Sequence, residues 1–260
     1  MENTSWKARL WGMVLLFALS ITVVEAQVKT QVIAHRGYWK TEGSAQNSLA
    51  SIRKAAEAGV YGSEFDVHLT ADGKLVVFHD DEVNGLKIQD SNFSDLSAVT
   101  LANGEKIPTL EQYLDEAKKW KDIELIFELK SHATPEREDE AVRRSVEMIE
   151  QQGLASRTTY IAFSLHAAEA FHRCAPDAEV YYLNGDLTPE ELKSRGLSGL
   201  DYHFKAIQEH PDWVKEAHEL GLKVNVWTVN DRAVMQEMKN LGVDYLTTDL
   251  PEEALEVIAE

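Results

Sequence analysis

The 260-residue sequence contains one cysteine, Cys174, and lacks several motifs that mark common enzyme classes. A single cysteine excludes an internal disulfide framework and any multi-cysteine zinc or iron–sulfur site. Free cysteines are usually buried in apolar surroundings, so we expect Cys174 to be a small buried side chain on a helix. The chain has no Gly-x-Ser-x-Gly motif, no P-loop and no dinucleotide-binding glycine pattern. Serine-hydrolase and nucleotide-cofactor functions therefore find no support.

Positive charge is also scarce. The 26 lysines and arginines stand against 44 acidic residues, which gives a formal net charge of −18. Such a surface repels nucleic acids and anionic membranes, because binding to either begins with neutralised phosphates. A small anionic substrate is compatible with this charge if a local group of cations faces it. The chain is 44% hydrophobic and 27% charged, which is typical of a folded protein.

Long hydrophobic runs are absent except for one short run near the N-terminus, over residues 10–24. Lys7 and Arg9 precede this run, and Glu25 and Ala26 follow its last residue, Val24. As a helix this run spans roughly 22 Å, whereas a membrane core needs roughly 30 Å, so a retained anchor is the weaker interpretation. The pattern predicts a secretory signal peptide over residues 1–26 and a mature protein that begins at Gln27. We therefore expect an exported protein, periplasmic or secreted, without stable membrane insertion after cleavage.

After residue 30 the chain alternates short β-rich runs with amphipathic helical segments. The strand-like runs are Gln31–Ala34, Gly62–Val67, Leu75–Phe78, Ile123–Leu129, Thr158–Phe163, Glu179–Leu183, Gly199–Tyr202, Leu222–Val229 and Asp244–Thr247. The clearest helical segments between them are Leu49–Ala58, Leu110–Trp120, Glu136–Gln152 and Ala233–Leu241. This alternation predicts a parallel sheet that is covered by helices.

Nine strand-like runs are one more than an eight-stranded barrel needs. Leu75–Phe78 follows Gly62–Val67 after a short link that contains Asp72-Gly73. A parallel crossover needs about a dozen residues, whereas Asp-Gly is typical of a tight hairpin turn. The sequence therefore predicts a single α/β domain over residues 27–260, a (β/α)8 TIM barrel with a hairpin excursion and a short insertion after the second strand. The insertion is expected over residues 80–108.

Charged residues interrupt four of the predicted strands at or near their C-terminal ends. The interruptions are His35-Arg36-Gly37, Glu64-Phe65-Asp66, Phe78-His79-Asp80 and Glu128-Leu129-Lys130. Barrel strands are buried on both faces and normally read as apolar runs. Because barrel enzymes place their active sites at the C-terminal ends of the strands, these four clusters predict an active site there.

Three carboxylates are expected to converge in this site. Glu64 and Asp66 alternate along one strand, so their side chains point to the same side, and Glu128 comes from the next strand. Three such groups repel one another unless a cation lies among them, and oxygen ligands favour Ca²⁺ or Mg²⁺ over zinc. The alternative is that they form structural ion pairs with Arg36 and Lys130.

Two histidines and two cations flank the predicted metal site. His35 ends the first strand, and the hairpin is expected to return His79 to a place opposite Glu64. Two histidines beside one metal suit a general acid and a general base, although a lone histidine at a strand end is more often structural. Arg36 and Lys130 can provide charge and hydrogen bonds for a phosphate.

Other candidates are less well defined. Trp227 ends a strand and its indole can line an apolar or alcohol subsite. His68 continues the same-face series but lies at the start of the hairpin, so we expect it to be solvated. His132 and His203 follow strand ends, from where their side chains could line the mouth of the barrel.

These motifs, in this order, resemble those of the glycerophosphodiester phosphodiesterase family. The resemblance runs from about residue 31 to residue 251. It rests on His35-Arg36-Gly37, Ala45-Gln46-Asn47-Ser48, Glu64-Phe65-Asp66-Val67, Leu69-Thr70-x-Asp72-Gly73, Val76-Val77-Phe78-His79-Asp80, Phe127-Glu128-Leu129-Lys130, Val226-Trp227-Thr228-Val229-Asn230, Gly242-Val243-Asp244 and Thr248-Asp249-Leu250-Pro251.

The resemblance implies a barrel enzyme that cleaves glycerophosphodiesters to glycerol 3-phosphate and an alcohol, with Ca²⁺ or Mg²⁺ as cofactor. Carried over by motif, it implies metal ligands at Glu64, Asp66 and Glu128, an acid–base pair at His35 and His79, phosphate binding by Arg36 and Lys130, and a cavity wall at Trp227. The chain departs from the family pattern at Gln46, where the family usually has a glutamate. An amide supplies no negative charge to a metal.

Two other functions remain open from the sequence. The first is a phosphodiesterase that acts on phosphoinositides or other lipid phosphodiesters. The second, from another class, is an exported protein that binds phosphodiesters without turnover, against which His35 and His79 argue because a receptor needs no proton shuttles. The expected partner is a small-molecule glycerophosphodiester substrate, and the sequence carries no signature of a particular oligomeric state.

Overall fold

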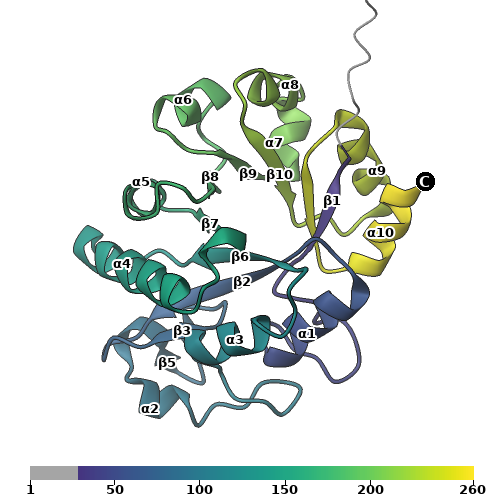
Figure 1. The fold of residues 1–260 in the computed structure, drawn as a ribbon. Coiled ribbons are helices and arrows are strands. Elements are labelled where there is room, and N and C mark those ends of the chain that lie inside the picture. The colour runs from purple at the N-terminus through teal and green to yellow at the C-terminus, as the bar shows by residue number, and fades with distance from the viewer. Residues whose placement is uncertain (1–28) are drawn as a thin grey trace, which may run out of the picture.

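The structure, a computed structural model, describes residues 29–260 and contains a closed barrel of eight parallel strands (Figure 1). The strand order is β1–β11–β10–β9–β8–β7–β6–β2, and pairing of β1 with β2 closes the barrel. The strands are β1 (Gln31–Ala34), β2 (Gly62–Leu69), β6 (Glu124–Leu129), β7 (Thr158–Ala162), β8 (Val180–Tyr182), β9 (Gly199–His203), β10 (Lys223–Trp227) and β11 (Tyr245–Thr248). The predicted TIM barrel is confirmed.

The predicted signal peptide, residues 1–26, lies outside the described residues and stays a prediction. From residue 29 onward, no helix combines the length and the apolar character that a membrane span requires.

Helices surround the barrel and follow its strands in sequence (Figure 1). They are α1 (Leu49–Ala58), α3 (Leu110–Ala117), α4 (Pro135–Gln151), α5 (Leu165–Cys174), α6 (Pro189–Ser194), α7 (Phe204–Glu209), α8 (Asp212–Glu219), α9 (Arg232–Leu241) and α10 (Pro251–Ala259). Capping boxes are present at Thr109 and Thr188, and Pro189 occupies the first turn of α6. Local sequence therefore defines where these two helices begin.

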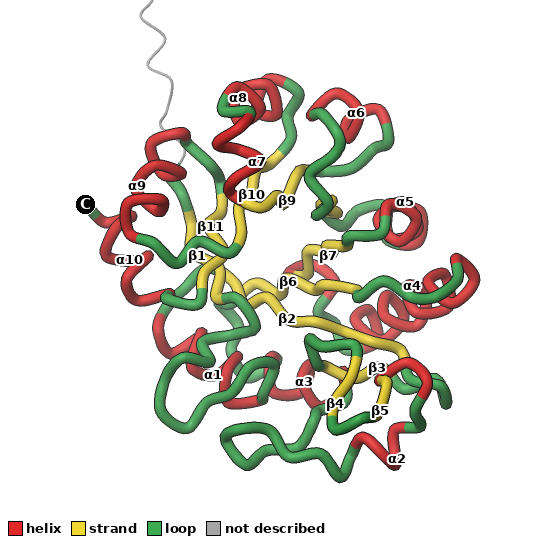
Figure 2. Tube along the Cα trace, turned by 180° about the vertical axis from the view of Figure 1, so that it is seen from behind, coloured by secondary structure: helices red, strands yellow, loops and turns green. Residues whose placement is uncertain are grey.

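The hairpin excursion is present as predicted. β3 (Leu75–Val77) pairs antiparallel with the end of β2, and the Phe78 N–H continues the ladder to the Asp66 carbonyl. The insertion that follows holds β4 (Glu82–Val83), β5 (Leu86–Lys87), a 3-10 turn over residues 88–90 and α2 (Phe93–Leu96). It has its own apolar core and lies at the barrel perimeter beside α3 (Figure 2). The hairpin thus returns His79 toward the carboxylates of β2.

The core has two layers. The larger cluster fills the space between the barrel and its helices, with contacting aromatic rings at Phe65, Phe127, Tyr160 and Phe171. A smaller cluster fills the barrel interior with Ile33, Ile126, Ile161, Tyr181, Leu183 and Tyr245. The barrel is therefore packed inside, and its charged residues gather above this packing at the C-terminal ends of the strands.

Two sequence-based predictions about burial are wrong. Cys174 is exposed, although its spacing matches the buried Ala167 and Phe171, because it is the last residue of α5. His68 is fully buried rather than solvated. Its Nδ1 lies 3.1 Å from Nε2 of Gln89, so a side chain of the insertion covers it.

Candidate active site

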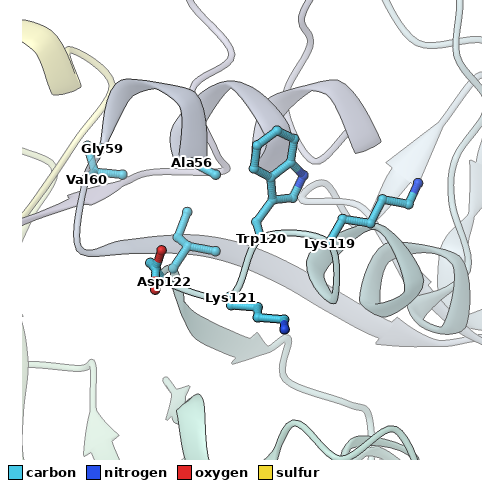
Figure 3. A pocket seen from close by; sticks show the side chains of 8 residues that line it. Ala56, Gly59, Val60, Lys119, Trp120, Lys121 and Asp122 are labelled. Carbon is cyan, nitrogen blue, oxygen red and sulfur yellow. The ribbon is translucent and has the colours of Figure 1, made fainter.

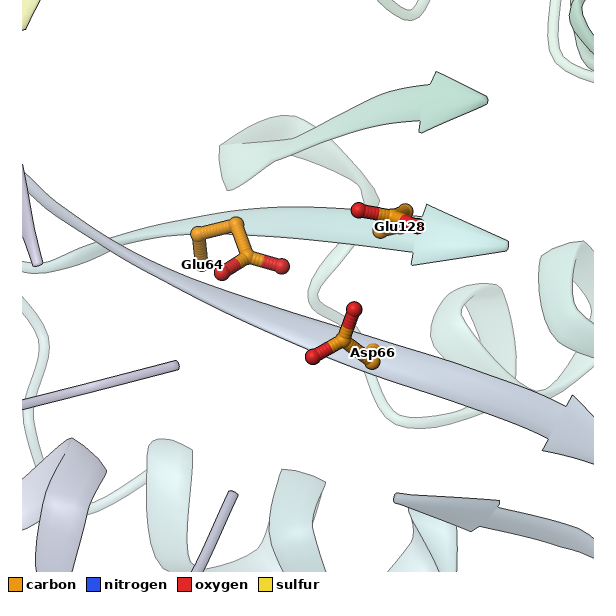
Figure 4. Close-up of side chains that lie close together, drawn as sticks. All are labelled: Glu64, Asp66 and Glu128. Carbon is orange, nitrogen blue, oxygen red and sulfur yellow. The ribbon is translucent and has the colours of Figure 1, made fainter. Parts of the chain in front are cut away.

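The three predicted carboxylates converge at the C-terminal side of β2 and β6. Asp66 and Glu128 are direct partners in the strand register, and Glu64 lies two residues before Asp66 on the same side of β2 (Figure 4). One oxygen from each group lies within 4.8 Å of the others, and all three residues are buried. Oxygens around Ca²⁺ lie about 2.3–2.6 Å from the ion, so this spacing fits a divalent cation.

A bound cation would also explain an unsatisfied atom. Within residues 29–260 the buried Oε1 of Glu64 has no hydrogen-bond partner. Burial and the neighbouring Asp66 and Glu128 carboxylates raise the pKa of Glu64 well above its usual range. Burial and Asp66 likewise raise the pKa of Glu128. The cluster therefore has a ligand atom and excess negative charge available for a divalent metal.

Asp66 is held in place by an amide and by cations. The Asn47 side chain donates from Nδ2 to Asp66 Oδ2 at 2.8 Å, and Asn47 Oδ1 accepts from the Asp66 backbone N–H at 3.1 Å. Lys130 Nζ lies 3.3 Å from Asp66 Oδ1 and 2.8 Å from Glu128 Oε1. Burial alone would raise the pKa of Asp66, but Lys130, His79, Asn47 and Arg36 together lower it.

The turn after β1 positions Arg36. The backbone of Arg36 is left-handed, with φ of 55°, and its N–H donates to Glu64 Oε2 at 2.8 Å. Gly37 follows with φ of 72°, and a Cβ there would lie 2.4 Å from Ser51 Oγ. The guanidinium approaches Asp66, with Nε 3.8 Å from Oδ2, and its Nη1 donates to Gln46 Oε1 at 2.8 Å. Gln46 therefore orients Arg36.

His35 is oriented by Asp249, which follows β11. His35 Nδ1 lies 2.7 Å from Asp249 Oδ1. Trp39 donates its indole N–H to the same oxygen at 3.0 Å, and Asn230 donates to the other carboxylate oxygen at 2.8 Å. Burial alone would raise the pKa of Asp249, but these hydrogen bonds outweigh it and hold the pKa below the usual range. Asp249 thus stays ionised and directs His35 Nε2 away from itself.

His79 has a similar arrangement at the end of the hairpin. Its Nδ1 lies 2.6 Å from Asp80 Oδ1. Burial lowers the pKa of His79; Lys130 adds to this effect and Asp66 opposes it. Both candidate histidines therefore use Nδ1 for a carboxylate, which leaves Nε2 of each available to a reacting group.

The predicted site residues other than Asp66 line one cavity. It has a volume of about 110 Å³ and is lined by His35, Arg36, Glu64, His79, Glu128, Lys130, Ile161, Phe163, Leu183, Asp201, Trp227, Thr228 and Thr247. Trp227 is a wall of this inner cavity. Asp66 is 1% exposed and does not line the cavity, but it belongs to the same carboxylate cluster as Glu64 and Glu128, which do. A wider groove of about 600 Å³ lies outside, lined by residues that include Trp39, Gln46, Phe78 and Leu101.

A second hollow lies at the other end of the barrel, where the chain enters β2 and β6. It has a volume of about 380 Å³ and contains Trp120, Lys119, Lys121 and Asp122 (Figure 3). Lys119 pairs with Glu116 at 2.6 Å. This hollow holds no group of carboxylates and faces the N-terminal ends of the strands, so it is not the candidate active site.

The roles of four further residues were not predicted from the sequence: Asp249, Asn47, Asp80 and Asp201. The first three stand inside the quoted motifs, and their positions beside strand ends or turns are the only signal that they orient other side chains. Asp201 interrupts an apolar strand, as Asp66 does, and that signal was available. The weaker candidate His203 packs its ring against Trp227. His132 instead accepts from the Leu69 N–H on the outside of the barrel.

The fold and the site define a class: a (β/α)8-barrel enzyme with an acidic metal-type cluster and cations arranged for an anionic substrate. Residues 35–253 match the family model described as "Glycerophosphoryl diester phosphodiesterase family". The chain belongs to this family, which confirms the resemblance.

Individual relatives agree with this assignment. A crystal structure of a glycerophosphodiester phosphodiesterase from Parabacteroides distasonis is 57% identical, with a TM-score of 0.89, over 90% of this chain and 98% of that one. A phosphodiesterase from Oleispira antarctica, solved with the product sn-glycerol-3-phosphate, is 27% identical, with a TM-score of 0.74, over 88% and 97% of the chains. The glycerophosphodiester phosphodiesterase of Caldanaerobacter subterraneus is 28% identical over 89% of this chain and 98% of its own length.

Proposed function

We propose that this protein hydrolyses glycerophosphodiesters to glycerol 3-phosphate and an alcohol. The observation that carries the proposal is the inner cavity, where three carboxylates, two cations and two carboxylate-oriented histidines meet. Membership of the family and the product bound to the Oleispira antarctica relative support the same substrate class.

The metal proposed for the site is Ca²⁺ or Mg²⁺, held by Glu64, Asp66 and Glu128. All the ligand atoms are carboxylate oxygens, which suit hard cations. When bound, such an ion supplies positive charge that polarises a phosphoryl oxygen. Asn47 keeps Asp66 in place for this role through the hydrogen bonds described above.

The chain's own residues bind the phosphate and move the protons. Arg36 and Lys130 face the cavity and stabilise the negative charge on the phosphoryl oxygens. One histidine accepts a proton at Nε2 from the attacking group. This group is either a water molecule or the glycerol hydroxyl on the carbon next to the phosphate ester. The other histidine donates a proton to the departing alkoxide, so that the P–O bond to the alcohol breaks as the new P–O bond forms.

Two spaces of different size suit the two halves of the substrate. The inner cavity is small and has Trp227 and Phe163 as apolar walls, which suits a three-carbon polyol. The wider groove is lined by Trp39, Phe78 and Leu101, which suits the leaving alcohol. We place the glycerol moiety inside and the alcohol outside.

A lipid phosphodiester is the second candidate substrate, and the apolar side chains of the outer groove favour it. A substrate panel separates the two. Glycerophosphocholine and glycerophosphoinositol are expected to be hydrolysed faster than phosphatidylinositol. Strong hydrolysis of phosphatidylinositol, without hydrolysis of either soluble diester, would contradict the proposed substrate and identify a lipid phosphodiester instead.

Metal chelation tests the cofactor and separates an enzyme from a binding protein. Hydrolysis is expected to stop in EDTA and to return when Ca²⁺ or Mg²⁺ is restored. Activity that survives chelation contradicts the metal proposal. A protein that binds glycerophosphocholine in the presence of either ion but never cleaves it is a receptor instead.

We also propose that residues 1–26 are a signal peptide and that the enzyme acts outside the cytoplasm. The support is the sequence pattern alone: a basic start, a short apolar run and small residues before the cut. Expression of the full chain in a bacterial host, followed by N-terminal sequencing of the exported protein, is expected to give Gln27 as the first residue. A product retained in the cytoplasm with its leader intact contradicts this proposal.

A further inference from the structure

Asp201 is a buried acid that takes part in none of the ion pairs described for the site. It lies on β9 and is 1% exposed, and its Oδ1 has no hydrogen-bond partner in the part of the chain that the structure describes. An unpaired polar atom in the interior destabilises a fold. A ligand that fills the cavity beside such an atom can supply the missing hydrogen bond.

Asp201 lies on the wall opposite the metal-type cluster. β9 and β2 are separated by the same number of strands in both directions around the closed barrel. Figure 1 shows them on opposite sides of it. Asp201 lines the inner cavity together with Trp227 and Thr247. Arg36 and Lys130 line the same cavity, so a ligand whose phosphate lies at these two cations shares the cavity with Asp201.

The groups around Asp201 are already paired. Asn225, its register partner on β10, bonds to the Thr247 hydroxyl at 3.0 and 3.1 Å. The Trp227 indole N–H donates to the backbone carbonyl of Asp201 at 2.9 Å. Among the described residues no lysine or arginine forms an ion pair with Asp201, so the carboxyl is not a counterion.

The chemistry of the carboxyl suits a neutral partner. Burial raises the pKa of Asp201 to about 8; a hydrogen bond from the Asn225 side chain opposes this effect, and the Glu128 carboxylate adds to it. A carboxyl that is largely protonated near neutral pH both donates and accepts hydrogen bonds, as an alcohol hydroxyl does. A second phosphate or a carboxylate would be repelled by Glu128.

We propose that Asp201 hydrogen-bonds a hydroxyl of the glycerol moiety and selects substrates that carry it. This inference rests on the proposed function and makes Asp201 a specificity-determining residue of that site. Gln46 does not compete for this role, because its Oε1 accepts from Arg36 and it lines the outer groove. The small inner cavity then holds the polyol between Trp227 and Asp201.

Two monoesters that differ only in their hydroxyls test the inference. Calorimetry of the Ca²⁺-loaded protein compares glycerol 3-phosphate with propyl phosphate. Asp201→Ala is expected to weaken binding of glycerol 3-phosphate about tenfold, the loss of one good hydrogen bond, and to leave propyl phosphate within about twofold. Asp201→Asn keeps a hydrogen-bonding side chain and is expected to remain within about threefold of wild type for both.

Control variants separate specificity from folding. Asp244→Asn changes a buried acid at the other end of β11, where Lys223 and His218 contact it, and is expected to leave both affinities unchanged. If Asp201→Ala does not fold, Asp201→Val gives the same comparison. Equal losses for both monoesters, or no loss, would overturn the inference. A wild-type protein that binds glycerol 3-phosphate but hydrolyses no glycerophosphodiester overturns the proposed function, and the calorimetric comparison still decides the role of Asp201.

Discussion

Asp249 and Asn47 act on the site through other side chains. Asp249 holds the ring of His35, and Asn47 holds the carboxylate of Asp66. Neither residue lines the inner cavity. Side chains in such positions set the tautomer of a histidine or the orientation of a metal ligand. Their removal therefore disturbs the reacting group that they hold.

At His35, we expect Asp249→Asn to lower kcat. The amide cannot stabilise a positively charged imidazole, and it can hold the ring in the wrong tautomer. Loss of one acid–base partner corresponds to a decrease in kcat of roughly 10²–10⁴-fold. The KM for glycerophosphocholine is expected to stay near the wild-type value. Steady-state kinetics measures both constants. Asp177→Asn, at an exposed acid, is the matched control, and a kcat for Asp249→Asn within threefold of wild type would contradict the role of Asp249.

At the metal cluster, we expect Asn47→Ala to weaken Ca²⁺ binding. Without the amide, Asp66 loses the two hydrogen bonds that Asn47 makes to it, to a carboxylate oxygen and to the backbone N–H. Removal of such a partner typically costs 10–100-fold in metal affinity. Calorimetric titration with Ca²⁺ measures the change, and Asn92→Ala, at an exposed asparagine, serves as the control. Unchanged affinity in Asn47→Ala would show that the cluster does not depend on this amide.

At the scale of elements, the turn between β1 and α1 brings the most groups to the site. It carries Arg36 and Asn47, both with left-handed backbones, and Gly37 between them. The Gly37 backbone passes so close to α1 that Ser51 leaves no room for a side chain. The placement of Arg36 over Glu64 therefore depends on this close approach.

Substitution of this glycine tests the turn. Gly37→Ala adds a left-handed alanine and a clash with Ser51, so we expect a loss of at least ~2 kcal/mol in the free energy of unfolding. Gly85→Ala is the matched control, because its φ is 79° and no described atom lies within 4 Å of the added Cβ. The control is expected to lose only ~1 kcal/mol. Urea unfolding measures both, and equal losses would show that the close packing at Gly37 contributes nothing.

The elements were predictable because their signals are local. Strand–helix alternation, the Asp-Gly turn and the capping residues all lie within a few positions of the structure they specify. The convergence of Glu64, Asp66 and Glu128 was predictable for a related reason, since strand alternation and neighbour order fix where those side chains point. The burial of His68 was not, because Gln89 reaches it from an insertion without regular pattern.

Pairings across long stretches of the chain were also beyond the sequence. Asp249 meets His35 only because β11 and β1 are neighbours in the closed barrel, and nothing local to either residue indicates this contact. The free oxygen of Asp201 is likewise a property of the assembled cavity. A sequence shows that an acid interrupts a strand, but only the structure shows whether anything pairs with it.

For the whole molecule, the formal net charge of −18 comes from acids in two different environments. Most acids are solvated, but three are buried within one cluster, where Arg36 and Lys130 offset only part of their charge. A divalent ion would complete the neutralisation. The folded protein is thus expected to bind the ion far better than the unfolded chain does, which couples metal binding to stability.

Thermal unfolding tests this coupling. At about 100 times its Kd, Ca²⁺ is expected to stabilise the protein by roughly 2.7 kcal/mol, or a rise in Tm of roughly 5–10 °C, and EDTA is expected to abolish the rise. Glu64→Gln removes one like charge, so its metal-free Tm is not expected to fall, but its Ca²⁺-dependent rise is expected to disappear. A Ca²⁺ effect of the same size in Glu64→Gln would place the ion elsewhere.

The central claim is that this barrel cleaves glycerophosphodiesters through the two histidines, and ³¹P NMR of one reaction tests it most directly. With glycerophosphocholine and Ca²⁺, the wild-type protein is expected to replace the diester signal with that of glycerol 3-phosphate, directly or after a cyclic phosphate. With His35→Ala or His79→Ala, the diester signal is expected to persist at least 100 times longer than with the wild-type protein. A diester signal that persists with the wild-type protein, or that disappears equally fast with either variant, would contradict the claim.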